Sequence, residues 1–329
     1  MSELHKFLFE GLPVRGMLVR LTDDWRQVLA RRAAGEDGAF TPEVRALVGE
    51  MTAAAVLMQA NIKFDGALVL QVFGDGPVKL AVAEVQPDLG FRATAKVAGE
   101  VPAGAQLEAL LNVHGRGRCA ITLDPKERLP GQQPYQGVVP LSRVTHDERR
   151  EPLQRVEQML EQYMRQSEQL DTRLVLAADD RSAAGLLIQR LPAEGEGNLE
   201  GSGSRAARSD DDSERAEAYQ RIALLAATLT HDELLALPAE QLLRRLFHEE
   251  ALRLFAPLAP RFACRCSAER VRGMLRSLGR EESDSLIAER GLVEVSCDFC
   301  GQAYRFDAVD VGEMFTPGRD QPPGSRAVQ

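Results

Sequence analysis

The chain contains the stretch Cys264-Arg265-Cys266 and, after thirty further residues (267–296), the stretch Cys297-Asp298-Phe299-Cys300. Four of the five cysteines therefore lie in two close pairs, while Cys119 lies far away in the sequence. Zinc takes four ligands in a tetrahedron, and two pairs of nearby thiolates are a common way for a short segment to supply them. The spacing predicts one metal site built from Cys264, Cys266, Cys297 and Cys300.

Three interpretations of this cysteine cluster are open. A permanent structural zinc site is the commonest role for such a pattern. A disulfide framework needs an oxidising compartment, and the start of the chain shows no apolar run of signal-peptide length, which disfavours it. The third is a redox switch, because each pair is close enough to form a disulfide when metal leaves. A segment this short should then unfold, since it has little core of its own.

The order of motifs along the chain resembles one known family. Beyond the cysteine pairs, the shared motifs run over nearly the whole chain: Phe64-Asp65-Gly66, Gly74-Asp75-Gly76-Pro77, Tyr135-Gln136-Gly137-Val138-Val139, the run from Tyr163 to Leu174, Phe247-His248-Glu249-Glu250, Tyr304 and Phe306. In this arrangement the sequence is similar to the redox-regulated bacterial holdase chaperones called heat-shock protein 33.

The resemblance implies an ATP-independent holdase, not an enzyme, that protects unfolding client proteins from aggregation under oxidative stress. In the reduced, idle state one Zn²⁺ per chain would be held by the four paired cysteines. Oxidation would form the disulfides Cys264–Cys266 and Cys297–Cys300, release zinc and unfold the linker, and the active protein would be a homodimer. Because CxxC closes a less hindered ring than CxC, Cys297–Cys300 is expected to form first.

Composition narrows the classes of partner. The 329 residues carry a net charge of −9, with a pI near 5.3. An acidic chain is poorly suited to nucleic acid, which selects basic surfaces, and to an anionic membrane. No segment approaches the roughly 18 apolar residues of a membrane-spanning helix. We therefore expect a cytoplasmic protein with neither nucleic acid nor membrane as partner and with reduced cysteines.

The hydrophobic pattern predicts an α+β protein with four regions. Residues 1–191 mix strand-like and helix-like periods and predict a mixed α/β core domain, which the resemblance assigns to client binding and dimerisation. Residues 192–260 predict a flexible acidic insert (192–213) and an amphipathic helical linker. Residues 261–313 are the predicted redox-switch zinc domain, and residues 314–329 a disordered tail.

Local signals place several elements of the core domain. Gly16–Leu21 reads as a strand, followed by a helix with Asp23 or Asp24 as its cap, and Thr41 caps a helix with Pro42 at its first position. Residues 67–73 and 78–85 predict a hairpin. Residues 148–167 predict one helix with an apolar stripe. Cys119 is expected to be a buried strand cysteine.

The predicted linker is helical over residues 214–255. Thr230 to Glu233 is a capping-box signature, and Pro238 opens a further helix. One face of that helix is apolar and needs a partner, for which the core domain is the nearest candidate; its residues are Leu242, Leu243, Leu246 and Phe247.

The sequence contains no nucleophile elbow, P-loop, HExxH or dinucleotide fingerprint, so no catalytic residue is assigned. Two other functions stay open. A constitutive zinc-ribbon adaptor would bind a partner through the linker helices and would not respond to oxidant. A thiol oxidoreductase would use Cys297 and Cys300, but the charge of Asp298 between them opposes a low-pKa thiolate.

Overall fold

The computed structural model describes residues 1–127, 131, 133–145, 147–191 and 205–316, with the side chains of 205–213 excepted. The chain divides into two compact units, Met1–Ala263 and Cys264–Gln329. Within the described residues, no helix combines the length and apolar character needed to cross a membrane.

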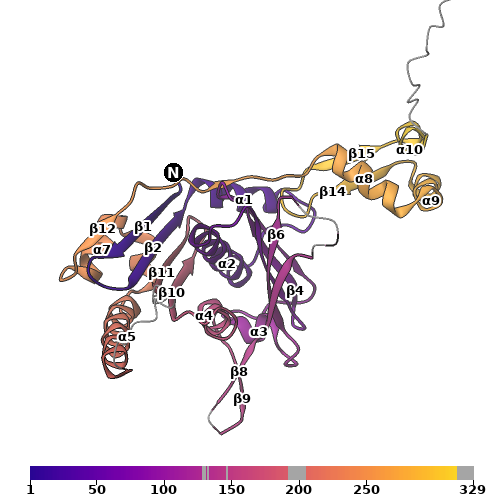
Figure 1. Ribbon diagram of the computed structural model, residues 1–329. Coiled ribbons are helices and arrows are strands. Elements are labelled where there is room, and N and C mark those ends of the chain that lie inside the picture. Colours follow the sequence, from indigo (N-terminus) through magenta and orange to yellow (C-terminus); the bar gives the residue numbers. More distant parts are fainter. Residues whose placement is uncertain (128–130, 132, 146, 192–204, 317–329) are drawn as a thin grey trace, which may run out of the picture. The chain divides into compact units, whose positions relative to one another are not determined.

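The first unit contains two large sheets (Figure 1). Sheet 1 is antiparallel throughout and has the order β10-β11-β2-β1-β12. Its strands are β1 (Glu3–Phe9), β2 (Val14–Leu21), β10 (Thr172–Ala178), β11 (Ala183–Arg190) and β12 (Leu252–Leu254). The predicted strand Gly16–Leu21 is confirmed within β2, whereas β1 was not separately predicted.

Sheet 2 has the order β13-β5-β4-β3-β6-β7 and is antiparallel except where β13 pairs in parallel with β5. Its strands are β3 (Gly66–Phe73), β4 (Val78–Val85), β5 (Gly90–Val97), β6 (Arg118–Pro125), β7 (Tyr135–Pro140) and β13 (Arg261–Phe262). The predicted hairpin is confirmed as β3 and β4, whose register joins Leu68 to Val85 and Phe73 to Leu80.

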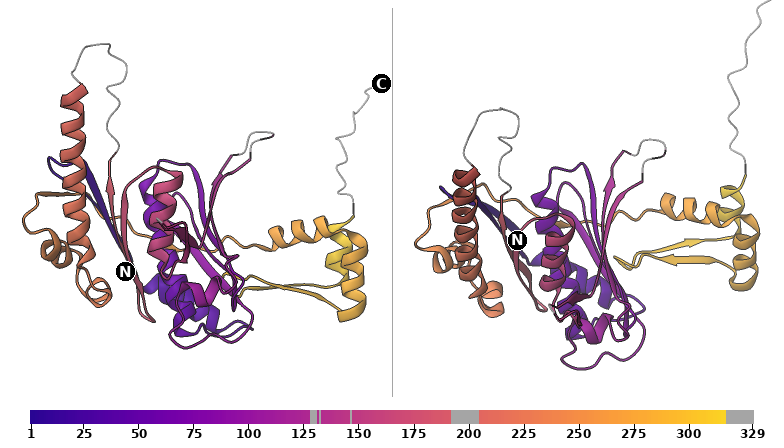
Figure 2. Two further views of the ribbon diagram at one scale, coloured as in Figure 1. Left: turned by 90° about the horizontal axis from the view of Figure 1, so that it is seen from below. Right: turned by 60° about the horizontal axis from the view of Figure 1, so that its bottom comes forward.

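Helix α2 (Pro42–Asn61) lies between the two sheets, and its side chains are buried on nearly every side (Figures 1 and 2). The Thr41 hydroxyl accepts a hydrogen bond from the Val44 amide at 3.4 Å, and Pro42 is the first helical residue, as predicted. A Cβ at Gly49 would come within 2.3 Å of the Ala178 Cβ. Glycine at this position therefore allows α2 to approach sheet 1 closely.

Two helix predictions for the core need correction. Helix α1 (Asp23–Ala33) begins one or two residues earlier than a cap at Asp23 or Asp24 predicts, because Thr22 is its N-cap. The predicted helix over 148–167 begins only at Val156, as α4 (Val156–Ser167), because residues 150–152 form strand β9 (Arg150–Pro152) against β8 (Ser142–Val144). Pro152 disfavours a helical conformation for the residue before it.

The linker helices cover the face of sheet 1 that is turned away from α2 (Figure 2). They are α5 (Arg205–Ala227), α6 (His231–Ala236) and α7 (Ala239–Phe247). The capping box at Thr230 and Glu233 and the helix after Pro238 are confirmed. The prediction that the helical region continues to Phe255 is wrong, because residues 252–254 form strand β12. Of the predicted flexible insert, residues 192–204 lie outside the described residues, and the backbone is helical from Arg205.

The second unit is small. It contains α8 (Ala268–Leu278), α9 (Arg280–Arg290), β14 (Val293–Ser296), β15 (Ala303–Phe306) and α10 (Ala308–Met314). Its buried hydrophobic cluster consists of Leu275, Val293, Phe306, Val311 and Met314. Residues 317–329 of the predicted tail lie outside the described residues. The mixed α/β fold class is thus confirmed.

Candidate metal centre and linker contacts

Two loops of the second unit carry the paired cysteines. Cys264 and Cys266 precede α8, whose N-cap Ser267 accepts a hydrogen bond from the Arg270 amide at 3.3 Å. Cys297 and Cys300 lie in the turn between the antiparallel strands β14 and β15.

Backbone hydrogen bonds fold the second cysteine pair into a tight turn. The amides of Cys300 and Gly301 both donate to the Cys297 carbonyl, at 3.2 and 2.8 Å, and the Cys297 amide donates to the Gln302 carbonyl at 3.0 Å. Gly301 has a φ of +68°, a left-handed conformation that glycine adopts without strain. This turn therefore brings the two sulfurs of the pair to one side of the hairpin end.

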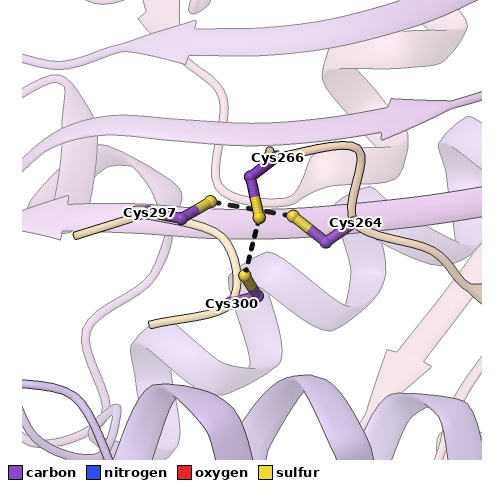
Figure 3. A group of neighbouring side chains, drawn as sticks. All are labelled: Cys264, Cys266, Cys297 and Cys300. Carbon is purple, nitrogen blue, oxygen red and sulfur yellow. Dashed lines mark hydrogen bonds between the residues drawn. The ribbon is translucent and has the colours of Figure 1, made fainter. Parts of the chain in front are cut away.

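The four sulfurs converge on one point (Figure 3). All lie within 4.8 Å of one another, with 3.7 Å between Cys264 Sγ and Cys297 Sγ and 3.4 Å between Cys266 Sγ and Cys300 Sγ. Both of these short contacts join one pair to the other. The four thiols are free, with no disulfide among them.

This donor set fits a zinc ion. A zinc–sulfur bond of about 2.3 Å in a tetrahedral site places neighbouring sulfurs about 3.8 Å apart, close to the separations found here. Four thiolates with no carboxylate or imidazole are also a soft donor set, which favours zinc over magnesium or calcium. The residues present can therefore hold one such ion without rearrangement of the loops.

Burial and hydrogen bonding shift the pKa values of three thiols of the cluster, downward for Cys264 and upward for Cys297 and Cys300. Burial opposes ionisation of Cys264, but hydrogen bonds from the Cys266 backbone and the neighbouring thiols lower its pKa to about 7. Burial raises the pKa values of Cys297 and Cys300, and the Cys264 charge adds to the shift at Cys297. The protein alone thus favours the Cys264 thiolate, whereas Cys297 and Cys300 need a nearby cation to ionise near neutral pH.

Tyr304 adds a contact whose role the sequence did not predict. Its hydroxyl lies 3.2 Å from Cys266 Sγ, and this hydrogen bond raises the pKa of Tyr304 to about 12. The register pairs Val295 in β14 with Tyr304 in β15, which places the tyrosine at the same hairpin end as the cysteines. A hydrogen bond from an outer group to a ligating sulfur orients the ligand and moderates its charge.

The apolar face of α7 lies buried in the first unit. Leu242, Leu243, Leu246 and Phe247 are each at most 3% exposed and join one hydrophobic cluster with side chains of sheet 1. The Phe247 ring meets the rings of Phe7 and Phe9 on β1. The face therefore has its partner within the chain.

Arg20 on β2 holds the same linker through polar contacts, a role that no sequence signal predicts. Its guanidinium donates to the Leu234 carbonyl at 3.0 Å and to the Leu237 carbonyl, at the end of α6. Burial lowers the pKa of Arg20, although nearby Glu3 opposes this. A half-buried cation on two carbonyls fixes α6 in position more specifically than apolar packing does.

Cys119 is separate from the cluster, as predicted for a buried strand cysteine. It is 0% exposed on β6, and burial raises its pKa to about 12. A neutral, inaccessible thiol is inert to oxidants and alkylating agents.

Comparison with known proteins gives the class and the family. The family described as Hsp33 protein matches residues 2–307. The 33 kDa chaperonin of Chromobacterium violaceum is 46% identical over 314 residues, covering 95% of this chain and 94% of the relative. That of Methylobacillus flagellatus is 41% identical over 325 residues, covering 97% and 98%.

A solved structure shares the fold. The 33 kDa chaperonin, or heat shock protein 33 homolog, of Thermotoga maritima superposes with a TM-score of 0.71 at 18% identity, covering 95% of this chain and 97% of that one. Fold, cysteine cluster and relatives together define a molecular chaperone. The chain belongs to the Hsp33 family, which confirms the resemblance inferred from its motifs.

Proposed function

We propose that this chaperone is a redox-regulated, ATP-independent holdase that is idle while Cys264, Cys266, Cys297 and Cys300 hold one Zn²⁺, and active after their oxidation. The observation that carries the proposal is the convergence of four thiols within 4.8 Å in a unit whose buried hydrophobic cluster, among the residues that the structure describes, has only five members. So small a core depends on its metal site for stability.

Bound zinc would supply charge that keeps the four sulfurs deprotonated and would tie the two loops together. The chain's own residues set the site around it: the turn at Gly301 aims the second pair, and Tyr304 restrains Cys266. Deprotonated sulfurs are nucleophiles, so the same arrangement that holds the metal also leaves the site open to oxidant.

The proposed oxidation proceeds in two steps per disulfide. A cysteine sulfur attacks hydrogen peroxide, becomes a sulfenic acid and releases one water. The partner thiol of the pair then displaces a second water from this sulfur and forms the S–S bond. Formation of each disulfide from two thiols thus reduces one hydrogen peroxide to two waters. We propose Cys264–Cys266 and Cys297–Cys300 as the products, which is the pairing that the resemblance to the family implies.

Loss of the thiolates would unfold the second unit and free the linker, which residues 261–263, including strand β13, join to this unit along the chain. Release of α7 would expose the apolar cluster between the linker and sheet 1. Such a surface binds unfolded client proteins and favours dimer formation. The net charge of −9 would keep client complexes soluble in the cytoplasm.

Zinc content and suppression of client aggregation, measured together before and after peroxide, test the proposal. The reduced protein should hold one zinc per chain and be idle, and the oxidised protein should have lost zinc and be active. Cys119→Ser is the matched control and should behave as the unaltered chain does. Aggregation suppression that is equal before and after oxidation would contradict the switch.

The adaptor alternative needs an accessible linker face, but that face is buried against sheet 1. An enzyme is not proposed, because the relatives are named as chaperonins and the four paired cysteines form a cluster suited to holding a metal ion. Turnover in an insulin-reduction assay would instead support the alternative function as a thiol oxidoreductase.

A further inference from the structure

The outer edge of β1 is covered by a short piece of the chain's own linker (Figure 1). Strand β12 pairs antiparallel with β1, with Leu254 opposite Phe7 and Leu252 opposite Phe9. The Glu10 amide donates to the Ala251 carbonyl at 2.8 Å, and the Phe255 amide donates to the Lys6 carbonyl at 2.9 Å. We call residues 251–255 the strap. It turns β1 from an edge strand into an interior strand of sheet 1.

Backbone hydrogen bonds hold the strap more than side-chain burial does. Leu254 is 47% exposed and Phe255 is 45% exposed, although both are large and apolar. A three-residue edge strand with half-exposed side chains has low local stability. Its contacts to β1 are also independent of side-chain identity, so any extended chain could replace them.

An apolar shelf adjoins this edge. Directly opposed residues of an antiparallel pair share one face of the sheet, so Leu252 and Leu254 lie on the same face as Phe7 and Phe9. Leu252 packs against the cluster that contains both phenylalanines and Phe247. A strand with apolar residues at alternate positions therefore matches both the edge and the shelf.

We propose that the β1 edge is a client-binding site, which the strap occupies in the idle protein. Its ligand would be an extended, unfolded polypeptide with apolar residues at alternate positions, added to β1 as an antiparallel strand. Recognition through the backbone explains how one site can take clients of unrelated sequence, and the alternating apolar residues select unfolded over folded chains. The inference rests on the proposed release of the linker, since only residues 248–250 separate the strap from α7.

A peptide of residues 250–256, labelled with a fluorophore, is the probe. The hydrogen bond from the Phe255 amide to the Lys6 carbonyl and the two-residue period of a strand place the amides of Phe255 and Arg253 toward β1. Those of Leu252 and Leu254 point away. N-methylation at 253 and 255 should weaken binding to the oxidised full-length protein by about tenfold, since two hydrogen bonds are lost. N-methylation at 252 and 254 is the matched control and should change it less than twofold.

A second variant tests the edge without oxidant. Arg253→Pro removes an amide that faces β1 and should open the edge in the reduced, zinc-loaded protein. Leu254→Pro removes an amide that faces away and is the control, because proline is tolerated on an edge strand when its nitrogen faces solvent. The peptide should bind Arg253→Pro and not Leu254→Pro, and zinc content should be equal in both.

Hydrogen exchange completes the test. In Arg253→Pro the Glu10 amide should exchange faster than in the unaltered chain and should become protected again when peptide or an unfolded client is added. Equal binding of both methylated peptides by an oxidised protein that suppresses aggregation would overturn the proposal and leave the redox switch intact. Protection of Glu10 by a second copy of the chain alone, with no effect of client, would also overturn it. If oxidant fails to activate the chaperone while Arg253→Pro still binds the peptide, the result would count against the redox switch and would support the β1 edge as a binding site.

Discussion

The ring of Phe247 in α7 meets the ring of Phe9 in β1 edge-on, with 5.0 Å between the ring centroids and 86° between the ring planes. Phe7 lies next to both rings, and its centroid is 6.2 Å from that of Phe247. This aromatic cluster joins the last residue of the linker helix to the strand whose edge the strap covers. Loss of the contact should therefore loosen α7 and the strap together.

We expect Phe247→Ala to make the reduced protein active as a chaperone. Truncation of a buried phenylalanine costs about 3–5 kcal/mol, a large part of the stability of a docked helix. Suppression of client aggregation without oxidant, at unchanged zinc content, is the measurement. His248→Ala is the control, because that neighbouring side chain is exposed. A folded Phe247→Ala protein that stays idle, with α7 shown by hydrogen exchange to be released, would mean that the linker is not the gate.

Arg20→Met should free α6 while leaving sheet 1 folded. The variant keeps the aliphatic part of the side chain and loses the hydrogen bonds to the Leu234 and Leu237 carbonyls, each worth about 1.5–3 kcal/mol for a charged donor. The amides of these two residues should exchange faster with solvent. Arg15→Met, on the same strand, is the matched control, because Arg15 donates to Gln189 and not to the linker. Equal exchange in the two variants would show that Arg20 does not hold α6.

Much of the fold follows from local sequence signals. Thr41 and Pro42 fix the start of α2, and the turn 74–77 fixes the hairpin of β3 and β4, because caps and tight turns depend on residues close in sequence. For residues 150–152 and 252–254 the sequence pattern predicts helix, but both segments are strands. Each is a three-residue strand stabilised by a distant or adjacent partner, and periodicity over so few residues cannot reveal that partner.

The candidate site also has one part that the sequence predicts and one part that it does not. The cysteine spacing suffices to predict that Cys264, Cys266, Cys297 and Cys300 meet, since each pair is local and zinc needs four ligands. The contacts of Arg20 with the linker join residues more than two hundred positions apart. Nothing in a single sequence marks such a pair, because an arginine on a strand is equally compatible with an exposed face.

Glu50 should make the stability of the first unit depend on pH. Burial, with the nearby Glu157 carboxylate, raises the pKa of Glu50 from 4.5 to about 8 although Arg155 opposes this. The folded protein therefore holds a proton that the unfolded chain releases above pH 4.5, so stability is lost as pH rises toward 8. Glu50→Gln should stabilise the reduced protein by roughly 1–3 kcal/mol at pH 7 and flatten the pH dependence.

Denaturant unfolding at pH 5 and pH 7 measures this effect. The control is Glu36→Gln, which changes an exposed carboxylate. The gain from Glu50→Gln should be larger at pH 7 than at pH 5. An equal gain at both values would show that Glu50 is ionised in the folded protein.

The order of oxidation is the sharpest test of the cysteine chemistry. Two residues separate Cys297 and Cys300, and their turn is already closed by hydrogen bonds from the Cys300 and Gly301 amides to the Cys297 carbonyl. One residue separates Cys264 and Cys266, so their disulfide closes a tighter and more strained ring. Cys297–Cys300 should form first and remove two of the four ligands, so that the metal is lost at that step.

Trapping with an alkylating agent along a peroxide time course, followed by peptide mass spectrometry, reads out this order. We expect an intermediate that lacks zinc, contains only Cys297–Cys300 and is partly active. In the reduced protein two close sulfur contacts run across the pairs, 3.7 Å for Cys264 with Cys297 and 3.4 Å for Cys266 with Cys300. Early accumulation of either cross-linked product would show that proximity in the metal site, and not ring closure after metal loss, decides the pairing. Cys264–Cys266 as the first product would show that the strain argument is wrong.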